Sequence, residues 1–306
     1  MARLKDLTRI PETLVGGHRL CSGCGASVAA RLVLRAADSP VVVAQSTGCL
    51  EVATTVYPYS SWRCSYIHSA FENAAATLSG VEAAYQALRR RGKVTEKMQF
   101  VAFGGDGGTY DIGLQSLSGT MERGHDLVYV CYDNEGYMNT GIQRSSATPT
   151  GAETTTTPVG TVIPGRQGRR KDMTAVMIAH GIPYVAQASI HDWNDLFTKA
   201  QKAFAVEGPA FLNVFAPCPR GWRHEGDLAV EVARLATETC YWPLFEVEDG
   251  KWKLNRRPRE KRPLVDYLKP QGRFRHLFRP DNRELLESLQ AEVDHNWEDL
   301  LRRTGN

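Results

Sequence analysis

The chain has 306 residues, of which 42% are hydrophobic and 23% charged, a composition that is typical of a folded globular protein and excludes a disordered chain, a collagen or a small disulfide-rich scaffold. The net charge of +3 is too small to indicate nucleic-acid binding, and no run of about 18 apolar residues is present to span a membrane. Because the first residues also lack the apolar core of a signal peptide, we expect a cytoplasmic protein with neither nucleic acid nor membrane among its partners.

Strands and helices are predicted to alternate along most of the chain, after an N-terminal arm over residues 1–20. Apolar runs predict strands at 41–44, 99–103, 126–132, 183–186 and 210–215, and helical patterns predict helices at 26–37, 70–91, near 115–123, 173–180 and 193–206. This alternation is typical of an α/β fold in which a parallel sheet is covered by helices on both faces.

Two segments interrupt the alternation. Residues 139–172 are rich in Thr, Gly and Pro, and such a long segment inside a compact domain is usually functional or binds a partner, a mobile surface loop being the alternative. Its basic cluster consists of Arg166, Arg169, Arg170 and Lys171. Residues 241–306 hold a hairpin at 245–254, a basic loop and a helix at 282–303. We therefore predict a domain over 1–240 and a C-terminal extension over 241–306 that packs on a neighbouring subunit.

A glycine-rich loop follows the strand that ends at Phe103. It reads Gly104-Gly105-Asp106-Gly107-Gly108, and glycines at this place let backbone N–H groups approach a phosphate closely. Asp106 within the loop is suited to bind a Mg²⁺ ion that bridges two phosphates. Alone, this motif is weak, because turns between strands and helices favour Gly and Asp for conformational reasons.

The next strand is followed by a second candidate for the same site. Asn134 comes directly after it, and adjacent parallel strands would bring Asn134 beside Asp106 at the carboxyl edge of the sheet, where ligands of such folds bind. Its side-chain oxygen and the backbone carbonyl of Gly136 can complete an octahedral Mg²⁺ site with diphosphate oxygens and a water.

Four of the seven cysteines form a second pattern. Cys21 and Cys24 are a Cys-x-x-Cys pair, Cys49 follows the strand at 41–44, and Cys218 follows the strand at 210–215. All four are predicted to lie in loops. Four thiolates suit a [4Fe–4S] cluster or a structural zinc, and their spacing alone selects neither. The other three, Cys64, Cys131 and Cys240, are predicted to be small buried side chains.

These two patterns together resemble a known family. Gly-Asp-Gly at 105–107, then 26 residues, then Asn134 is similar to the thiamine diphosphate motif, except that Glu135 stands where a second Asn is common. That ending, together with the four cysteines and the blocks at 67–76, 181–188 and 271–274, resembles the beta subunit of the 2-oxoacid:ferredoxin oxidoreductases, of the pyruvate synthase type.

The resemblance implies a fold and a set of cofactors. It implies the thiamine diphosphate-binding fold, with thiamine diphosphate, Mg²⁺ and one [4Fe–4S] cluster. The implied cluster ligands are Cys21, Cys24, Cys49 and Cys218, the implied Mg²⁺ ligands are Asp106, Asn134 and Gly136, and the cofactor would also contact Gly105, Gly107, Gly108 and Cys49. Asn139 and Thr140 are expected near the reacting centre, and Glu51 is a candidate there whose alternative is a surface or capping carboxylate.

It also implies an activity and partners. Oxidative decarboxylation of a 2-oxoacid with coenzyme A would pass electrons through the cluster to ferredoxin, in a complex with alpha, gamma and delta subunits without which the chain is inactive. Pyruvate is the first expected substrate; branched-chain and aryl 2-oxoacids and oxalate are alternatives. Two other readings stay open: a zinc-stabilised thiamine decarboxylase, and a non-catalytic subunit with a vestigial site.

Overall fold

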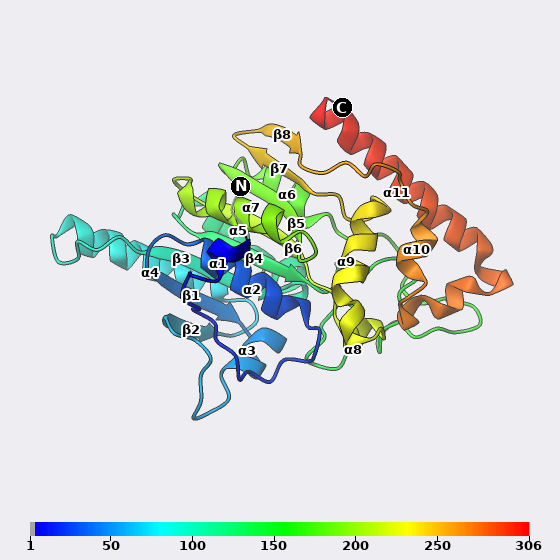
Figure 1. The fold of residues 1–306 in the computed structure, drawn as a ribbon, viewed down its shortest axis with the longest axis horizontal. Helices are drawn as coiled ribbons and strands as arrows, with labels where there is room; N and C mark the ends of the chain where they lie inside the picture. Colours follow the sequence, from blue (N-terminus) through cyan, green and yellow to red (C-terminus); the bar gives the residue numbers. More distant parts are fainter. Residues whose placement is uncertain (1–3, 306) are drawn as a thin grey trace.

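One sheet of eight strands organises the protein, in the order β2-β1-β3-β4-β6-β5-β7-β8 (Figure 1). The computed structural model describes residues 4–305. Six strands are parallel: β2 (Ser65–Ser69), β1 (Val41–Ser46), β3 (Gln99–Gly105), β4 (Val128–Asp133), β6 (Ala210–Phe215) and β5 (Tyr184–Ser189). β7 (Phe245–Glu248) and β8 (Lys251–Leu254) form an antiparallel hairpin that joins the sheet beside β5.

Helices cover both faces of the sheet. Alternate residues of each central strand face opposite cores, so that Val130 and Tyr132 of β4 belong to one core and Tyr129 and Cys131 to the other. The first core is covered by α2 (Gly25–Ala36) and α7 (Trp193–Ala205), which pack together, and the second by α4 (Ala74–Arg90), α5 (Leu114–Glu122) and α6 (Met173–Ala179). The predicted fold class is therefore confirmed.

The C-terminal segment packs on the chain's own core. Leu244, Tyr267 and Leu277 are at most 1% exposed and lie in the first core with residues of the sheet. The remaining helices of the described chain are α1 (Leu4–Leu7), α3 (Cys49–Thr54), α8 (Pro219–Trp222), α9 (Ala229–Glu238), α10 (Leu264–Leu268) and α11 (Arg283–Thr304), with short turns η1 (Gly107–Asp111), η2 (Gly226–Leu228), η3 (Gly272–Phe278) and η4 (Pro280–Asn282). Among residues 4–305, none of the helices combines the length and apolar character needed to cross a membrane.

All five strands predicted up to residue 215 are present, and three corrections apply elsewhere. The helix predicted from residue 70 begins at Ala74, after a turn. The edge strand β2 was not predicted, because its sequence is polar and its residues are largely exposed or half-buried. Helices α3 and α9 were also not predicted, and α3 places Cys49 at the start of a helix where a loop was expected.

Candidate functional site

The predicted site residues gather at the carboxyl edge of the sheet. Strands β1, β3, β4 and β6 are neighbours, with Gly105 of β3 opposite Tyr132 of β4 and Asp133 of β4 opposite Phe215 of β6. Shortly after the ends of these four strands come, in the same order, Cys49, Asp106, Asn134 and Cys218. Parallel pairing thus brings both sequence patterns to one edge.

The glycine-rich loop is closely packed by its surroundings. A Cβ atom at Gly107 would lie 2.3 Å from the ring of Tyr137, and one at Gly108 would lie 3.0 Å from the carbonyl oxygen of Phe71. The Tyr137 hydroxyl donates to the Gly107 carbonyl at 3.1 Å. A side chain at Gly107 or Gly108 would therefore meet atoms that already occupy this space.

Asp106 is fully buried in this loop. Its Oδ1 accepts the backbone N–H of Asn134 at 3.2 Å, and its Oδ2 accepts the Ser145 hydroxyl at 2.5 Å. Burial, followed by the nearby charge of Asp133, raises the pKa of Asp106 well above its ordinary value. A cation beside Asp106 would counter both effects and favour the carboxylate form.

The side-chain amide of Asn134 lies between Asp106 and the backbone carbonyl of Gly136. One terminal atom of the Asn134 amide lies 2.9 Å from Asp106 Oδ1 and 2.9 Å from the Gly136 carbonyl oxygen. With nitrogen at this position, the amide donates to both oxygens; with oxygen there, three oxygens face one another. The left-handed backbone of Glu135, with φ of 64°, turns the chain between Asn134 and Gly136.

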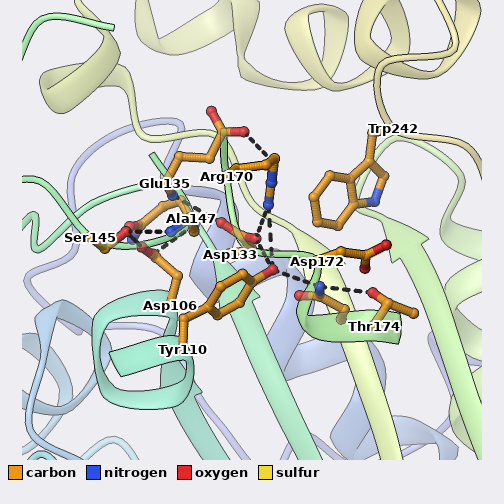
Figure 2. A network of polar contacts seen from close by, with 12 residues as sticks. Asp106, Tyr110, Asp133, Glu135, Ser145, Ala147, Arg170, Asp172, Thr174 and Trp242 are labelled. Atoms are coloured by element: carbon orange, nitrogen blue, oxygen red, sulfur yellow. Dashed lines mark hydrogen bonds and ion pairs between the residues drawn. The ribbon is translucent and has the colours of Figure 1, made fainter. Parts of the chain in front are cut away.

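A buried ionic network supports this turn (Figure 2). Asp133 accepts hydrogen bonds from the Tyr110 hydroxyl at 2.6 Å and from Arg170 at 2.7 Å, and Arg170 also contacts Glu135 at 2.7 Å. Asp133 and Glu135 are fully buried. Burial alone would lower the pKa of Arg170, but Tyr241 and Asp133 raise it well above its ordinary value, so the guanidinium stays charged between the two carboxylates.

Glu135 also connects the turn to the C-terminal segment. It accepts hydrogen bonds from the Tyr241 hydroxyl at 2.5 Å and from Arg273 of η3 at 2.5 Å. The Arg273 guanidinium lies 3.9 Å from the centre of the Trp222 ring. The residue that departs from the usual thiamine motif therefore anchors the turn through two arginines and a tyrosine.

The four cysteines lie close enough to influence one another. All are free, and burial raises the pKa of Cys49 to about 12, with Cys218, Cys24 and Cys21 adding to the rise. The pKa of Cys218 rises to about 11 through burial and through Cys24 and Cys21. Cys49 begins α3 and Cys218 caps α8, where its sulfur accepts the Gly221 N–H at 3.3 Å. The prediction of loops for all four is therefore wrong for Cys49.

Two glycines allow the segment that carries Cys21 and Cys24 to pack closely against the backbone around Cys218. The N–H of Gly25 donates to the Pro217 carbonyl at 3.2 Å, and a Cβ at Gly25 would lie 2.7 Å from the backbone of Ala216. A Cβ at Gly23, whose φ is 76°, would lie 2.0 Å from the carbonyl oxygen of Gly226.

The cysteine segment and the metal loop are also bonded to each other. The indole N–H of Trp222, in the helix that Cys218 caps, donates to the carbonyl of Asn134 at 2.7 Å. The two parts of the site are thus held in one framework rather than carried on separate mobile loops.

Asn139 and Thr140 line a narrow groove beside this framework, together with Cys49, Gly105 and Asn134. Glu51 does not line it. Its carboxylate accepts the Thr55 hydroxyl at 2.9 Å and lies 3.6 Å from His68 Nε2. The structure therefore brings two of the three candidate catalytic residues to the groove and places Glu51 on the adjoining helix α3.

The remaining cysteines lie apart from this arrangement. Cys131 and Cys240 are buried, as predicted, whereas Cys64 is half-buried. In the described part of the chain, no three His, Cys, Asp or Glu side chains are placed to hold a single metal ion. Sequence reasoning missed Ser145, Tyr110 and the ionic network. The one available signal was the basic cluster at 166–171, which was predicted only to belong to a segment that is functional or binds a partner.

Comparisons with known proteins agree with this geometry. Residues 46–214 match the family described as thiamine pyrophosphate enzyme, C-terminal TPP binding domain. The chain is 54% identical to pyruvate synthase subunit PorB of Thermotoga maritima over 291 residues, which cover 93% of this chain and 90% of the relative. It is 52% identical to PorB of Methanocaldococcus jannaschii (92% and 94% covered) and 45% identical to ketoisovalerate oxidoreductase subunit VorB of Pyrococcus furiosus (98% and 96%).

A solved structure shares the fold. The 2-oxoglutarate:ferredoxin oxidoreductase from Magnetococcus marinus matches with a TM-score of 0.56 at 20% identity, over 73% of this chain and 79% of that one.

Proposed function

The chain belongs to the family of 2-oxoacid oxidoreductase subunits that includes PorB of pyruvate synthase, and from this premise we propose that it is the cofactor-binding beta subunit of a 2-oxoacid:ferredoxin oxidoreductase. The complex oxidatively decarboxylates a 2-oxoacid, transfers the acyl group to coenzyme A and passes electrons to ferredoxin. The observation that carries the proposal is the placement of Asp106, Asn134 and the four cysteines at the same sheet edge.

The oxygen geometry supports Mg²⁺ with a diphosphate. Mg²⁺ binds oxygens at about 2.1 Å in an octahedron, so neighbouring ligands are about 3.0 Å apart. The Asn134 amide lies 2.9 Å from both Asp106 Oδ1 and the Gly136 carbonyl oxygen, which fits adjacent positions of an octahedron. Gly105, Gly107 and Gly108 have no side chains, so phosphate oxygens would approach their backbone N–H groups.

Thiamine diphosphate, when bound, supplies a nucleophilic carbon and an electron sink for the bond that CO2 leaves. The chain's own residues orient it. Asp106, Asn134 and Gly136 would hold the metal. Ser145 and the Asp133–Arg170–Glu135 network keep this loop in place, and Asn139 and Thr140 line the groove beside it.

The cysteine group supports a [4Fe–4S] cluster. Burial raises the pKa values of Cys24, Cys49 and Cys218, and neighbouring cysteines add to each rise, so a positively charged soft metal centre would favour these free thiols as thiolates. The cluster, when bound, accepts electrons one at a time. Gly25 and Trp222 fix these cysteines relative to the metal loop, so cofactor and cluster occupy one rigid edge.

Partners complete the enzyme. We propose alpha, gamma and delta subunits, with the alpha subunit supplying the carboxylate that activates the aminopyrimidine ring, and ferredoxin as electron acceptor. Residues 139–172 and 241–306 are proposed to contact these subunits. The same two segments also stabilise the metal loop through contacts inside this chain. The complex is proposed to work in the cytoplasm.

Pyruvate is the first candidate substrate, because three PorB relatives exceed 50% identity. A branched 2-oxoacid is the second, because the ketoisovalerate subunit VorB is similar over 98% of the chain at 45% identity. The groove identified here does not distinguish them, since it would be completed by the alpha subunit.

The test is an assay of the complex purified without oxygen. Viologen reduction would be measured with pyruvate, 3-methyl-2-oxobutanoate, phenylglyoxylate, 2-oxoglutarate and oxalate, each with and without coenzyme A. We expect coenzyme A-dependent reduction with pyruvate and loss of it in the Asp106→Ala complex. Iron and zinc analysis of the same sample separates the cluster from the zinc-stabilised decarboxylase: zinc without iron, together with acceptor-independent CO2 release, would contradict the proposal.

A further inference from the structure

The hydroxyl of Tyr132 is a buried donor at the centre of the site. Tyr132 is 2% exposed and lies on β4, one residue before the Asp133–Asn134 turn. Within residues 4–305, its hydroxyl oxygen is inaccessible to solvent and has no hydrogen-bond partner. A tyrosine hydroxyl buried without a partner carries a substantial desolvation penalty, so an acceptor that is supplied only when a cofactor or metal centre binds is the natural explanation.

The surroundings of this hydroxyl identify the acceptor. A Cβ atom at Gly48 would lie 2.8 Å from the hydroxyl oxygen, and Gly48 directly precedes Cys49. A Cβ at Gly105, on the side of the metal loop, would lie 3.5 Å away. Tyr132 and Cys49 line the same groove. The hydroxyl is thus positioned between the cysteine group and the cofactor loop, closer to the Cys49 segment.

The chemistry of the two groups favours the same partner. The phenol hydroxyl of Tyr132 is a hydrogen-bond donor, and the sulfur of Cys49 becomes an acceptor of negative charge once a metal centre holds it as a thiolate.

We propose that Tyr132 donates a hydrogen bond to the Cys49 thiolate of the iron–sulfur cluster and thereby raises the cluster's reduction potential. This inference rests on the proposed function, because it requires the cluster. Reduction adds negative charge to the cluster and its ligands, and a hydrogen bond to a ligand sulfur stabilises the more negative state. Tyr132 is a positioning and tuning residue; it takes no part in bond making.

The test replaces the hydroxyl while keeping the ring. In the intact complex, Tyr132→Phe should retain the iron content of the wild type but shift this chain's cluster to a more negative midpoint potential in an EPR-monitored redox titration. The signal of this cluster is identified as the one that a Cys49→Ser complex loses. Tyr129→Phe is the matched control: Tyr129 is equally buried on the same strand, but its hydroxyl contacts Thr109 at 3.1 Å and faces the other core.

A second variant displaces the hydroxyl without removing it. Gly48 has an extended backbone, with φ of 164°, so alanine is tolerated by the backbone and its Cβ meets only the Tyr132 hydroxyl. Gly48→Ala should therefore shift the potential in the same direction as Tyr132→Phe. In the Tyr132→Phe background, which has no hydroxyl to displace, Gly48→Ala should add no further shift.

Three results would overturn the inference. An unchanged potential in Tyr132→Phe at full iron content would show that the hydroxyl does not serve the cluster. Weaker thiamine diphosphate binding at an unchanged potential would assign the hydroxyl to the cofactor instead. Equal iron content in the wild-type and Cys49→Ser complexes would refute the cluster itself. This iron measurement therefore separates a failure of the proposed function from a failure confined to Tyr132.

Discussion

Replacement of Arg170 by methionine is the sharpest test of how the metal loop is held. The substitution leaves a side chain of similar length without its charge. Asp133 would lose its ion pair at 2.7 Å and keep the Tyr110 hydroxyl and the Glu135 N–H, whereas Glu135 would retain Arg273 and Tyr241. The loss of stability therefore comes mainly from Asp133, which is fully buried.

The expected magnitude follows from that burial. Removing one partner of a buried ion pair costs about 3–5 kcal/mol, and because Arg170 is 21% exposed and Glu135 keeps other donors, we expect the lower end, about 3 kcal/mol. At about 2 °C per kcal/mol for a chain of this size, Tm should fall by about 6 °C. Differential scanning calorimetry of the purified complex measures this, and a thiamine diphosphate titration should show weaker binding, because Asn134 lies within the loosened turn.

The neighbouring arginine provides the control. The side chain of Arg169 is 75% exposed and lies 3.5 Å from Glu292, so Arg169→Met should cost no more than about 1 kcal/mol. The double variant Asp133→Asn/Arg170→Met leaves neither of the two charges and should cost less than the sum of its single variants. Equal Tm changes for the two arginine variants, or strictly additive costs in the double variant, would refute this account of the network.

Three further predictions test other parts of the site. Asp106→Ala should abolish Mg²⁺-dependent thiamine diphosphate binding in a calorimetric titration, because it removes the anionic ligand. An unchanged affinity for thiamine diphosphate would contradict the assignment of Asp106 as a Mg²⁺ ligand. Gly25→Ala should lower the iron content, because its Cβ would lie 2.7 Å from the Ala216 backbone, whereas Gly16→Ala, where nothing lies within 4 Å, should not; equal iron in both variants would count against the packing argument. Burial alone would raise the pKa of Glu246, but hydrogen bonds from Lys253, Tyr184 and Asn255 lower it to about 2. The ionised Glu246 therefore contributes its full stabilisation above the ordinary pKa of 4.5, and this contribution is lost as the pH falls to about 2. In Glu246→Gln, the free energy of unfolding should therefore fall less steeply between pH 4.5 and pH 2 than in the wild type. An equally steep fall in both proteins would contradict the lowered pKa of Glu246.

The strands that were predictable from the sequence are those buried on both faces of the sheet. The central strands, such as β4 and β6, are buried along their whole length, so their sequences are continuous apolar runs that are recognisable without a partner strand. The edge strand β2 has no such run, and its Ser65 and His68 are exposed. Helix α3 is six residues long, too short for its periodicity to be distinguished from a loop.

The site was predictable where short motifs carry it. Asp106 and Asn134 were found because each follows an apolar strand, and parallel pairing then requires them to meet. The supporting residues were not found, because Glu135 and Arg273 are separated by 138 positions and only the folded chain brings them together. The cysteine spacing likewise identifies four candidates without choosing the metal, since both iron–sulfur and zinc accept four thiolates.

The most direct test of the central claim is EPR of the anaerobic complex after addition of pyruvate and coenzyme A without an external acceptor. If electrons leave the thiamine site through this chain's cluster, the wild-type complex should develop reduced iron–sulfur signals, while the Cys49→Ser complex, assembled and loaded with thiamine diphosphate, should develop none. Reduced iron–sulfur signals that appear at the wild-type rate in the Cys49→Ser complex would contradict the account.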